Sequence, residues 1–511
     1  MRKEFNIVCR GSWLSLAQVE LFCQKVKAYF PDLVLNTIVK ETKGDREQST
    51  PLHLVEGKDF FTAEIQEDLR NGIADFAVHS MKDVSGDAFF ENSFYRIIDR
   101  NDIRDIAIFK EDILDKLATG KTIVIGTSSP RRTLMATDFL QKALPQLSEY
   151  PIKIEAIPIR GNVDGRLRKL DESGEYDGII LAAAGLNRLL GYEPAKATLE
   201  ALLSKKKLMF LPLFECPPAA GQGAIVVETN QANQDAISML ESIASMEHTN
   251  AVQAERVFAE KYGYGCSRPF GVFHKDLAHC SFTYASGLNQ QLEPFTEWKQ
   301  PIDLNPASIE VFSGTDHMRS FYTETNLDHG KIPASTTAVF VASHKSIHSI
   351  ALIKQCQRKR VWAAGSRTWL ALAQKGIWVE GSADGLGLDS LLPLFETSLV
   401  QLDKTQCCIV TNQNSVVGWL SEGWHATATY CLHPSLDTNL IATIGKVDLV
   451  FWSSYQQWLV GSPYVKPGVI HACPSGKTAT RLQGLGLNPL IFPTIKAFQS
   501  WRQDIPVTEG A

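Results

Sequence analysis

The chain has 511 residues, enough for roughly three to five domains. Its apolar content of 44% and charged content of 21% are ordinary for a soluble globular protein, and a net charge of -5 argues against bulk nucleic-acid binding. No apolar run approaches the length of a membrane span. Ten cysteines without a CxxC pair or a histidine spacing suited to zinc predict reduced thiols, no metal site and a cytoplasmic protein.

The first predicted unit is a strand at residues 5–9, the turn Arg10-Gly11-Ser12 and a helix at 14–29. Free N–H groups at the start of such a helix can bind an anion, although a plain strand–helix loop has the same pattern. Further on, Lys58 follows a glycine in a polar loop, and we interpret it as a candidate lid residue.

A short buried strand is predicted at residues 74–78, and polar residues including Lys82 and Asp83 follow its carboxyl end. In open α/β sheets, ligands bind at the carboxyl ends of strands. The Lys82–Asp83 pair is therefore either a solvated ion pair or a charge pair held for chemistry.

The strand at 122–126 ends in a turn rich in hydroxyl and guanidinium groups, Thr127-Ser128-Ser129-Pro130-Arg131-Arg132. Proline suits the first helical turn and a hydroxyl suits the cap before it. Hydroxyls, free N–H groups and two guanidiniums thus gather at one helix start, which favours a carboxylate or phosphate ligand.

A second basic stretch contains Arg160, Gly161, Asn162 and Arg166. Residues 121–170 hold nine Lys/Arg against four Asp/Glu, a local excess of positive charge in an acidic chain. A solvated basic helix would explain the arginine and lysine at 168 and 169, but not arginines at loop and helix starts. The pattern therefore favours an anion site.

The strand at 178–183 leads to Arg188, and the chain returns through a Pro- and Gly-rich segment that contains Gln222. Two βα-rich halves with two crossings describe a pair of lobes around a cleft. This arrangement resembles periplasmic binding proteins, which clamp acidic ligands. A binding protein without turnover is thus one hypothesis.

Cys266 lies between two glycines and a proline, in YGYGCSRPFG. Buried structural cysteines usually lie inside strands or helices. A thiol on a Gly-rich turn is an attachment point or nucleophile, unless this is a simple surface loop.

Residues 5 to about 290 resemble the porphobilinogen deaminase (hydroxymethylbilane synthase) family. The resemblance rests on AVHSMKDV, GTSSPRR, RGNVDGR, DGIILAAAGLNR, PAAGQGA and GCSRPFG, in this order. It implies a dipyrromethane cofactor bound covalently to Cys266, to which four porphobilinogen molecules are added with loss of ammonia. It also implies that Asp83 is the catalytic carboxylate, which stabilises the cationic azafulvene formed as the amine leaves. Leu54 stands where the family commonly has a lysine, so Lys58 must act alone in a lid.

The resemblance, together with the acidity of the substrate, assigns two sets of contacts. The expected cofactor contacts are Lys82, Asp83, Thr127, Ser128, Ser129, Arg131, Arg132, Arg160, Gly161 and Asn162. The expected substrate contacts are Arg10, Ser12, Lys58, Arg166 and Arg188, with Gln222 on the side of a hinge.

The last third of the chain contains an internal repeat. Residues 339–343 are echoed at 450–454, and residues 361–368 at 470–478. The order of these βα units resembles uroporphyrinogen-III synthase, whose opening strand–helix–strand is not recognisable in residues 300–335, interpreted as a linker. The resemblance and the polar residues after the predicted strands give these candidates: Ser343, Thr368, Tyr430, Ser453, Ser454 and Thr478. Thr368 and Thr478 could equally be helix caps.

We therefore expect an α/β protein with two periplasmic-binding-protein-like lobes, a small α+β domain and a flavodoxin-like two-lobed region. The predicted boundaries are 1–100 plus 218–240, 101–217, 241–325 with the cofactor cysteine, and 335–511. The leading hypothesis is a monomeric bifunctional deaminase–synthase of haem biosynthesis. The alternatives are a deaminase with a degenerate C-terminal half and the binding protein.

Overall fold

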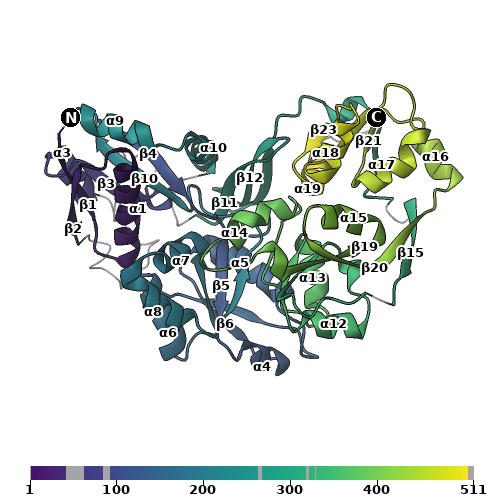
Figure 1. Cartoon of the computed structure of the whole chain (residues 1–511), viewed down its shortest axis with the longest axis horizontal. Coiled ribbons are helices and arrows are strands. Elements are labelled where there is room, and N and C mark those ends of the chain that lie inside the picture. Colours follow the sequence, from purple (N-terminus) through teal and green to yellow (C-terminus); the bar gives the residue numbers. More distant parts are fainter. Residues whose placement is uncertain are drawn as a thin grey trace. The chain divides into compact units, whose positions relative to one another are not determined.

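The computed structural model describes residues 2–41, 63–84, 92–262, 268–317, 321–328 and 330–503. The chain divides into two compact units (Figure 1). The first unit comprises Met1–His274, Ala285–Glu297 and Pro393–Gln401. The second comprises Lys275–Tyr284, Trp298–Leu392 and Leu402–Ala511.

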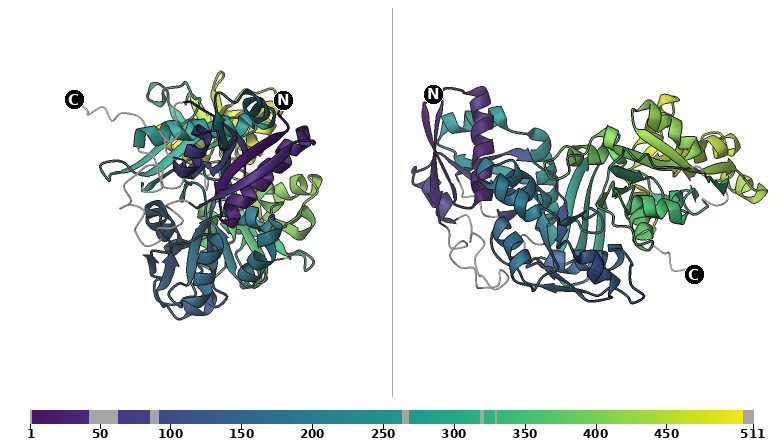
Figure 2. Two further views of the ribbon diagram at one scale, coloured as in Figure 1. Left: turned by 90° about the vertical axis from the view of Figure 1, so that its left-hand side faces the viewer. Right: turned by 60° about the horizontal axis from the view of Figure 1, so that its bottom comes forward.

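Lobe 1 of the first unit is built on a five-stranded sheet in the order β2-β1-β3-β10-β4. The three strands nearest the N-terminus are parallel, while β10 runs antiparallel to β3 and β4. Helix α1 lies along this sheet (Figures 1 and 2), and Phe22 of α1 packs edge-on against Phe76 of β3. The elements are β1 (Glu4–Arg10), α1 (Trp13–Tyr29), β2 (Val34–Lys40), α3 (Ala63–Arg70), β3 (Phe76–Ser80), η2 (Met81–Asp83), β4 (Ser93–Arg100), β10 (Ala224–Asn230) and α9 (Gln234–Ile243).

Lobe 2 has a five-stranded sheet in the order β7-β6-β8-β5-β9, in which only β5 runs antiparallel to its neighbours. The chain enters this lobe through residues 101–104 and returns through 211–223. The two predicted βα-rich lobes with two crossings are thus confirmed. The elements are β5 (Asp105–Phe109), α4 (Ile113–Ala118), β6 (Ile123–Gly126), α5 (Pro130–Ala143), β7 (Ile154–Ile157), α6 (Val163–Glu172), β8 (Gly178–Ala182), α7 (Ala183–Leu190), α8 (Glu193–Leu203) and β9 (Lys207–Phe210).

Helix α10 (Met246–Tyr262) precedes a three-stranded sheet of β11 (Phe270–Asp276), β12 (Ser281–Leu288) and β13 (Pro294–Lys299). Tyr262 at the end of the helix stacks on Phe295 of β13, with ring centroids 3.9 Å apart. The helix and the sheet therefore share a small apolar core.

The second unit contains two sheets. Lobe 3 has six strands in the order β15-β20-β19-β16-β17-β18, and lobe 4 has four in the order β14-β21-β22-β23. Parallel pairing of β16 with β17 and of β21 with β22 confirms the predicted repeat of βα units. The strands are β14 (Val311–Ser313), β15 (Tyr322–Asn326), β16 (Ala338–Val341), β17 (Arg360–Ala363), β18 (Gly381–Ser382), β19 (Cys407–Asn412), β20 (His425–Pro434), β21 (Leu449–Phe451), β22 (Ile470–Pro474) and β23 (Leu490–Phe492).

Helices connect these strands, as expected for an α/β unit. They are α12 (Ile350–Cys356), α13 (Ser366–Ala373), α15 (Gln413–Ser421), α16 (Thr438–Ile444), α17 (Tyr455–Gly461), α18 (Lys477–Gly484) and α19 (Ile495–Gln503). Helix α14 (Leu392–Phe395) also lies between β18 and β19 in the chain, but most of it belongs to the first unit.

The predicted linker at residues 300–335 is wrong in part, because it supplies β14 and β15. Strand β14 pairs in parallel with β21, and β15 pairs antiparallel with β20. Phe312 of β14 is buried in the core of lobe 4. Strands this short carry no periodic signal, and their partners lie far along the chain. Apart from Lys275–Tyr284, the second unit begins at Trp298, whereas the sequence predicted the last domain to begin at residue 335.

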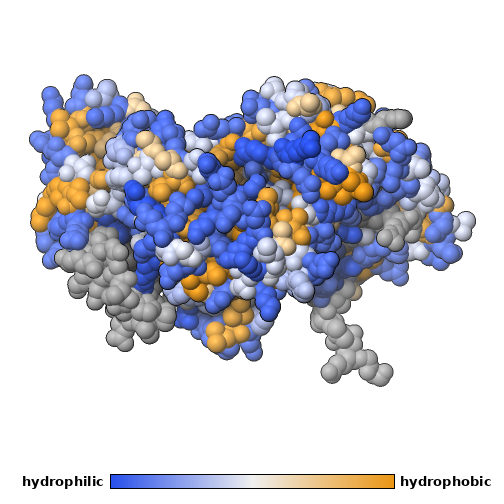
Figure 3. All heavy atoms as spheres, turned by 90° about the horizontal axis from the view of Figure 1, so that it is seen from below, coloured by the Kyte–Doolittle hydropathy of each residue, from blue (hydrophilic) through white to orange (hydrophobic). Residues whose placement is uncertain are grey.

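Among the described residues, no helix is long and apolar enough to cross a membrane. The face in Figure 3 carries hydrophobic residues in small separate groups among hydrophilic ones.

Candidate active site

The turn between β6 and α5 forms as the sequence predicts. Pro130 is the first residue of α5, and the Ser129 hydroxyl caps the helix by accepting a hydrogen bond from the Arg132 amide at 3.5 Å. The Thr127 hydroxyl accepts from the Ser129 amide at 3.3 Å. The local sequence therefore places the guanidiniums of Arg131 and Arg132 on the first turn of α5.

A second turn is bonded to the first. The Ser128 hydroxyl donates to the Ile159 carbonyl at 2.7 Å and accepts from the Ile159 amide at 3.1 Å. Gly161 has a φ of 118°, in the region that favours glycine, and Asn162 caps α6. Arg166 of α6 then donates from Nε to the Gly161 carbonyl at 2.8 Å. Ser128 thus joins the two basic stretches that the sequence keeps apart.

Beneath these arginines lies Asp105, a fully buried residue that sequence reasoning missed. Its carboxylate is paired with Arg131 and with Arg132, each at 2.8 Å. Burial by itself would raise the pKa of Asp105, but the two guanidinium charges outweigh burial and hold that pKa well below its usual range. The only signal for this residue was its place at the start of a strand, directly after the first crossing.

Asp83 of lobe 1 and the arginines of lobe 2 share one electrostatic environment. The pKa of Arg166 is lowered to about 10, mainly by burial and also by the charges of Arg132 and Arg160, while the charge of Asp83 opposes the shift. Lys82 and Asp83 are half-buried in η2, at the carboxyl end of β3. The fold therefore brings Asp83 of lobe 1 near Arg132, Arg160 and Arg166 of lobe 2, which come from three separate stretches of the sequence.

Two guanidinium nitrogens at this place are buried and have no hydrogen-bond partner among the described residues: Arg132 Nε and Arg160 Nη2. An unpaired buried donor is costly, so such atoms point to a missing acceptor. The donors suit an acidic ligand such as a carboxylate-bearing cofactor.

Arg10 and Ser12 lie at the same edge of the lobe 1 sheet, since β1 is parallel to β3. Ser12 caps α1 by accepting from the Ser15 amide at 3.3 Å. Gln18 of the same helix donates to the Ser80 hydroxyl at 2.7 Å, which fixes α1 against the end of β3.

Gln222 lies on the second crossing between the lobes, and Arg188 of α7 is bonded to that crossing. Arg188 is paired with Asp99 at 3.4 Å and donates to the Gly223 carbonyl. Burial lowers the pKa of Arg188, and Asp99 opposes that shift. The Gln222 amide donates to the Ile103 carbonyl at 2.7 Å and to Asp105 at 2.9 Å, so it joins the two crossings.

Cys266, Lys58 and Leu54 lie outside the described residues. The elements that flank residue 266 are anchored to the second crossing. Glu255 of α10 accepts from the Gly221 amide at 2.8 Å and from the His274 amide at 2.9 Å. A Cβ on Gly271 would lie 2.1 Å from the Pro217 carbonyl oxygen, so only glycine fits there.

Comparison with known proteins identifies this unit. Residues 5–238 match the family model "Porphobilinogen deaminase, dipyromethane cofactor binding domain". A porphobilinogen deaminase of Syntrophus aciditrophicus is 32% identical over 271 residues, which are 52% of this chain and 79% of that protein. One from Listeria monocytogenes is 36% identical over 274 residues, 53% of this chain and 81% of its own length.

The chain belongs to the porphobilinogen deaminase family. The matched region is the part that binds dipyrromethane in this family, and it contains both lobes of the first unit. These relatives cover the N-terminal half only. A uroporphyrinogen-III synthetase of Helicobacter pylori matches with 15% identity and a TM-score of 0.24, over 35% of this chain and 88% of that one.

Outside the deaminase lobes, lobe 3 brings two of the predicted candidates together. Burial raises the pKa of Tyr430, and hydrogen bonds to Asn412 and Ser343 oppose the rise. Ser343 also caps a short 3₁₀ helix by accepting from the Lys345 amide at 3.4 Å.

Four candidates of the second unit remain: Thr368, Thr478, Ser453 and Ser454. The cap interpretation is wrong for Thr368 and Thr478, because Gly365 and Gly476 hold the cap positions of α13 and α18. Sequence alone could not show this, since a helix can begin one or two residues earlier than its first polar side chain suggests. In lobe 4, Ser454 caps α17, and the Ser453 hydroxyl donates to Gln457 Oε1 at 2.7 Å.

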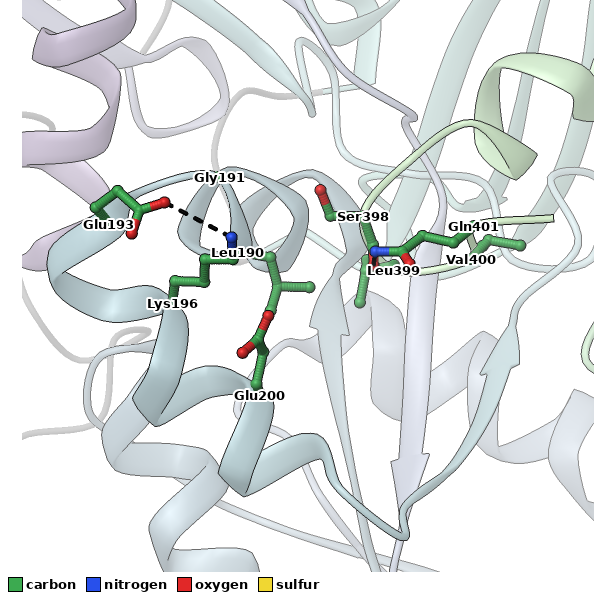
Figure 4. A pocket seen from close by; sticks show the side chains of 9 residues that line it. All are labelled: Leu190, Gly191, Glu193, Lys196, Glu200, Ser398, Leu399, Val400 and Gln401. Atoms are coloured by element: carbon green, nitrogen blue, oxygen red, sulfur yellow. Dashed lines mark hydrogen bonds and ion pairs between the residues drawn. The ribbon is translucent and has the colours of Figure 1, made fainter.

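A pocket of about 400 Å³ lies in the first unit between α8 and residues 398–401 (Figure 4). Its charged lining consists of an exposed Glu193–Lys196 pair at 3.6 Å and Glu200. No predicted site residue lines it, so this pocket is separate from the arginine cluster.

Proposed function

We propose that the first unit condenses four porphobilinogen molecules into hydroxymethylbilane, in tetrapyrrole biosynthesis, on a dipyrromethane bound to Cys266. The observation that carries the proposal is the convergence of Asp83 with Arg132, Arg160 and Arg166. The charge of Asp83 thus acts within a group of guanidiniums, as the charge pattern of the reaction requires.

The arginines match the acid side chains of the substrate. Each porphobilinogen carries two carboxylates, so a growing chain adds two negative charges per unit. A hydrogen bond to a charged group contributes about 1.5–3 kcal/mol. The buried donors Arg132 Nε and Arg160 Nη2 lack a partner in the described part of the chain and would gain most from such a ligand.

Asp83 matches the reacting carbon. Loss of ammonia from porphobilinogen leaves positive charge on the pyrrole, and a fixed carboxylate stabilises charge as it develops. Asp83 stands on the short helix directly after β3, whose carboxyl end α1 fixes through Gln18 and Ser80. The carboxylate is thereby held by a rigid sheet edge before the substrate binds.

The dipyrromethane would supply the nucleophilic pyrrole carbon to which the units are added. Arg131, Arg132 and Arg160 would hold its carboxylates through their guanidiniums. Gly271, five positions after Cys266, packs on Pro217, whose carbonyl accepts from Arg131 at 2.6 Å.

Intact-mass measurement of the full chain under denaturing conditions tests this proposal. We expect a mass increment of one dipyrromethane, absent in Cys266→Ser and present in Cys473→Ser, which removes a buried thiol of lobe 4. Addition of porphobilinogen should then produce a ladder of heavier species. An unmodified chain without turnover would contradict the proposal and favour a binding protein.

We infer that the second unit is a uroporphyrinogen-III synthase. The support is its repeated βα architecture, the two crossings at β15 and β20 between lobes 3 and 4, and the buried Tyr430 with Ser343 and Asn412. Hydroxymethylbilane closes spontaneously to the wrong isomer in water, so a tethered synthase gains from a high effective concentration of its substrate.

The isomers of uroporphyrinogen formed from porphobilinogen by the full chain decide this second activity. We expect mainly isomer III, and Tyr430→Phe should raise the share of isomer I. Tyr464→Phe, at an exposed tyrosine, is the matched control and should leave the ratio unchanged. Isomer I alone from the unmutated chain would show that the second unit is not an active synthase.

A further inference from the structure

We propose that Asp105 is a positioning residue of the deaminase reaction, whose carboxylate sets the two arginines of α5 and couples them to both crossings between the lobes. The inference rests on the proposed ligand role of Arg131 and Arg132. It adds a residue that contacts neither cofactor nor substrate in the proposed scheme.

The carboxylate of Asp105 has a partner on each side. Oδ1 accepts from Arg132 Nη2 at 2.8 Å and from Gln222 Nε2 at 2.9 Å, and Oδ2 is paired with Arg131 Nη1 at 2.8 Å. Asp105 itself is fully buried. A buried carboxylate with three charged or amide partners is held in one orientation.

The Asp105 carboxylate also determines which guanidinium N–H groups remain available to bind a ligand. Arg132 uses Nη2 on Asp105 and Nη1 on the Ile180 carbonyl at 3.1 Å. Its Nε is left buried without a partner in the described structure. Two buried guanidiniums side by side would repel each other, and one carboxylate between them allows both to remain charged. The pair then presents a net charge of about +1 to a ligand.

Both crossings meet at this carboxylate. Gln222, on the second crossing, bonds Asp105 and the Ile103 carbonyl of the first crossing. Arg131 donates to the Pro217 carbonyl, also on the second crossing. A ligand that moves the arginines therefore acts on the hinge segments, and a hinge motion acts on the arginines.

Steady-state kinetics of the full-chain holoenzyme with Asp105→Asn test the inference. Asparagine keeps the shape and an acceptor oxygen but loses the charge. We expect the covalent cofactor to remain, kcat to fall about tenfold or more, and KM to change less than kcat. Intact-mass spectra during turnover should show stalled intermediates. Asp177→Asn is the matched control, a lobe 2 carboxylate bonded to Lys116 and the Val124 amide, and should leave kcat unchanged.

Gln222→Leu keeps all three charges and removes only the link between the crossings. We expect it to lower kcat, and its effect should not add to that of Asp105→Asn in the double variant. If Asp105→Asn does not fold, the kinetics of Gln222→Leu test the inference instead. Unchanged kinetics in the folded variants, or a lower Tm with normal kcat, would overturn the inference. Normal kinetics and cofactor content in Arg132→Gln would instead show that the proposed ligand role has failed.

Discussion

The arginine cluster of lobe 2 and the hydroxyl groups of lobe 4 look alike in sequence, since both follow strands and precede helices. They differ in what the fold leaves unpaired. Arg132 and Arg160 each retain a buried donor without a partner in the described part of the chain. Ser454 and Ser453 are both bonded within their own turn, to the Gln457 amide and side chain. Unsatisfied donors on several neighbouring guanidiniums suit an acidic ligand, whereas a satisfied hydroxyl needs none.

The largest expected effect tests the centre of the deaminase site. Asp83→Asn removes the negative charge that opposes the arginines, so turnover should fall about 100-fold or more while the cofactor stays attached. Single-turnover kinetics and intact mass measure the two quantities separately. Near-normal rates would refute the role given to this carboxylate.

The second effect tests the unpaired donors. Arg160→Gln removes a half-buried guanidinium with an unpartnered nitrogen, and KM for porphobilinogen or the retention of intermediates should worsen about 10- to 100-fold. Arg168→Gln, at an exposed position of α6, is the matched control. Equal effects of the two variants would mean that the overall positive charge of this region attracts the substrate, and that Arg160 is not part of a specific binding site.

A third effect is expected at alkaline pH. The pKa of Arg166 is about 10, well below that of a free guanidinium. Arg166 is therefore charged below pH 10 and loses its proton as the pH rises through this value. The neutral side chain binds carboxylates more weakly than the charged one. KM should rise in that range, and Arg166→Gln should show a high KM without this rise. A wild-type KM that stays flat up to pH 10.5 would contradict the assignment.

The smallest effect is expected in lobe 4. Ser454→Ala removes the cap of α17 and should lower the free energy of unfolding of the second unit by about 1 kcal/mol. Deaminase turnover should not change. Denaturant unfolding measures the loss, and Ser421→Ala, at an exposed serine at the end of α15, is the control. A changed isomer ratio at unchanged stability would show that Ser454 acts on a ligand instead.

Short stretches of the sequence are enough to predict the local parts of the site. Pro130 and Ser129 begin α5 and Asn162 caps α6 because a cap needs only residues within three positions of each other. The repeated strands of the second unit can likewise be predicted from the sequence, since each is a short apolar run.

The partners of the charged side chains depend on contacts between distant parts of the chain. Asp105 lies under Arg131 and Arg132, and Arg188 is paired with Asp99 across a crossing. These pairs join residues far apart in the chain, so no local sequence pattern predicts them. Strand β14 belongs to lobe 4 for the same reason, because three residues become a strand only when β21 supplies the edge on which they pair.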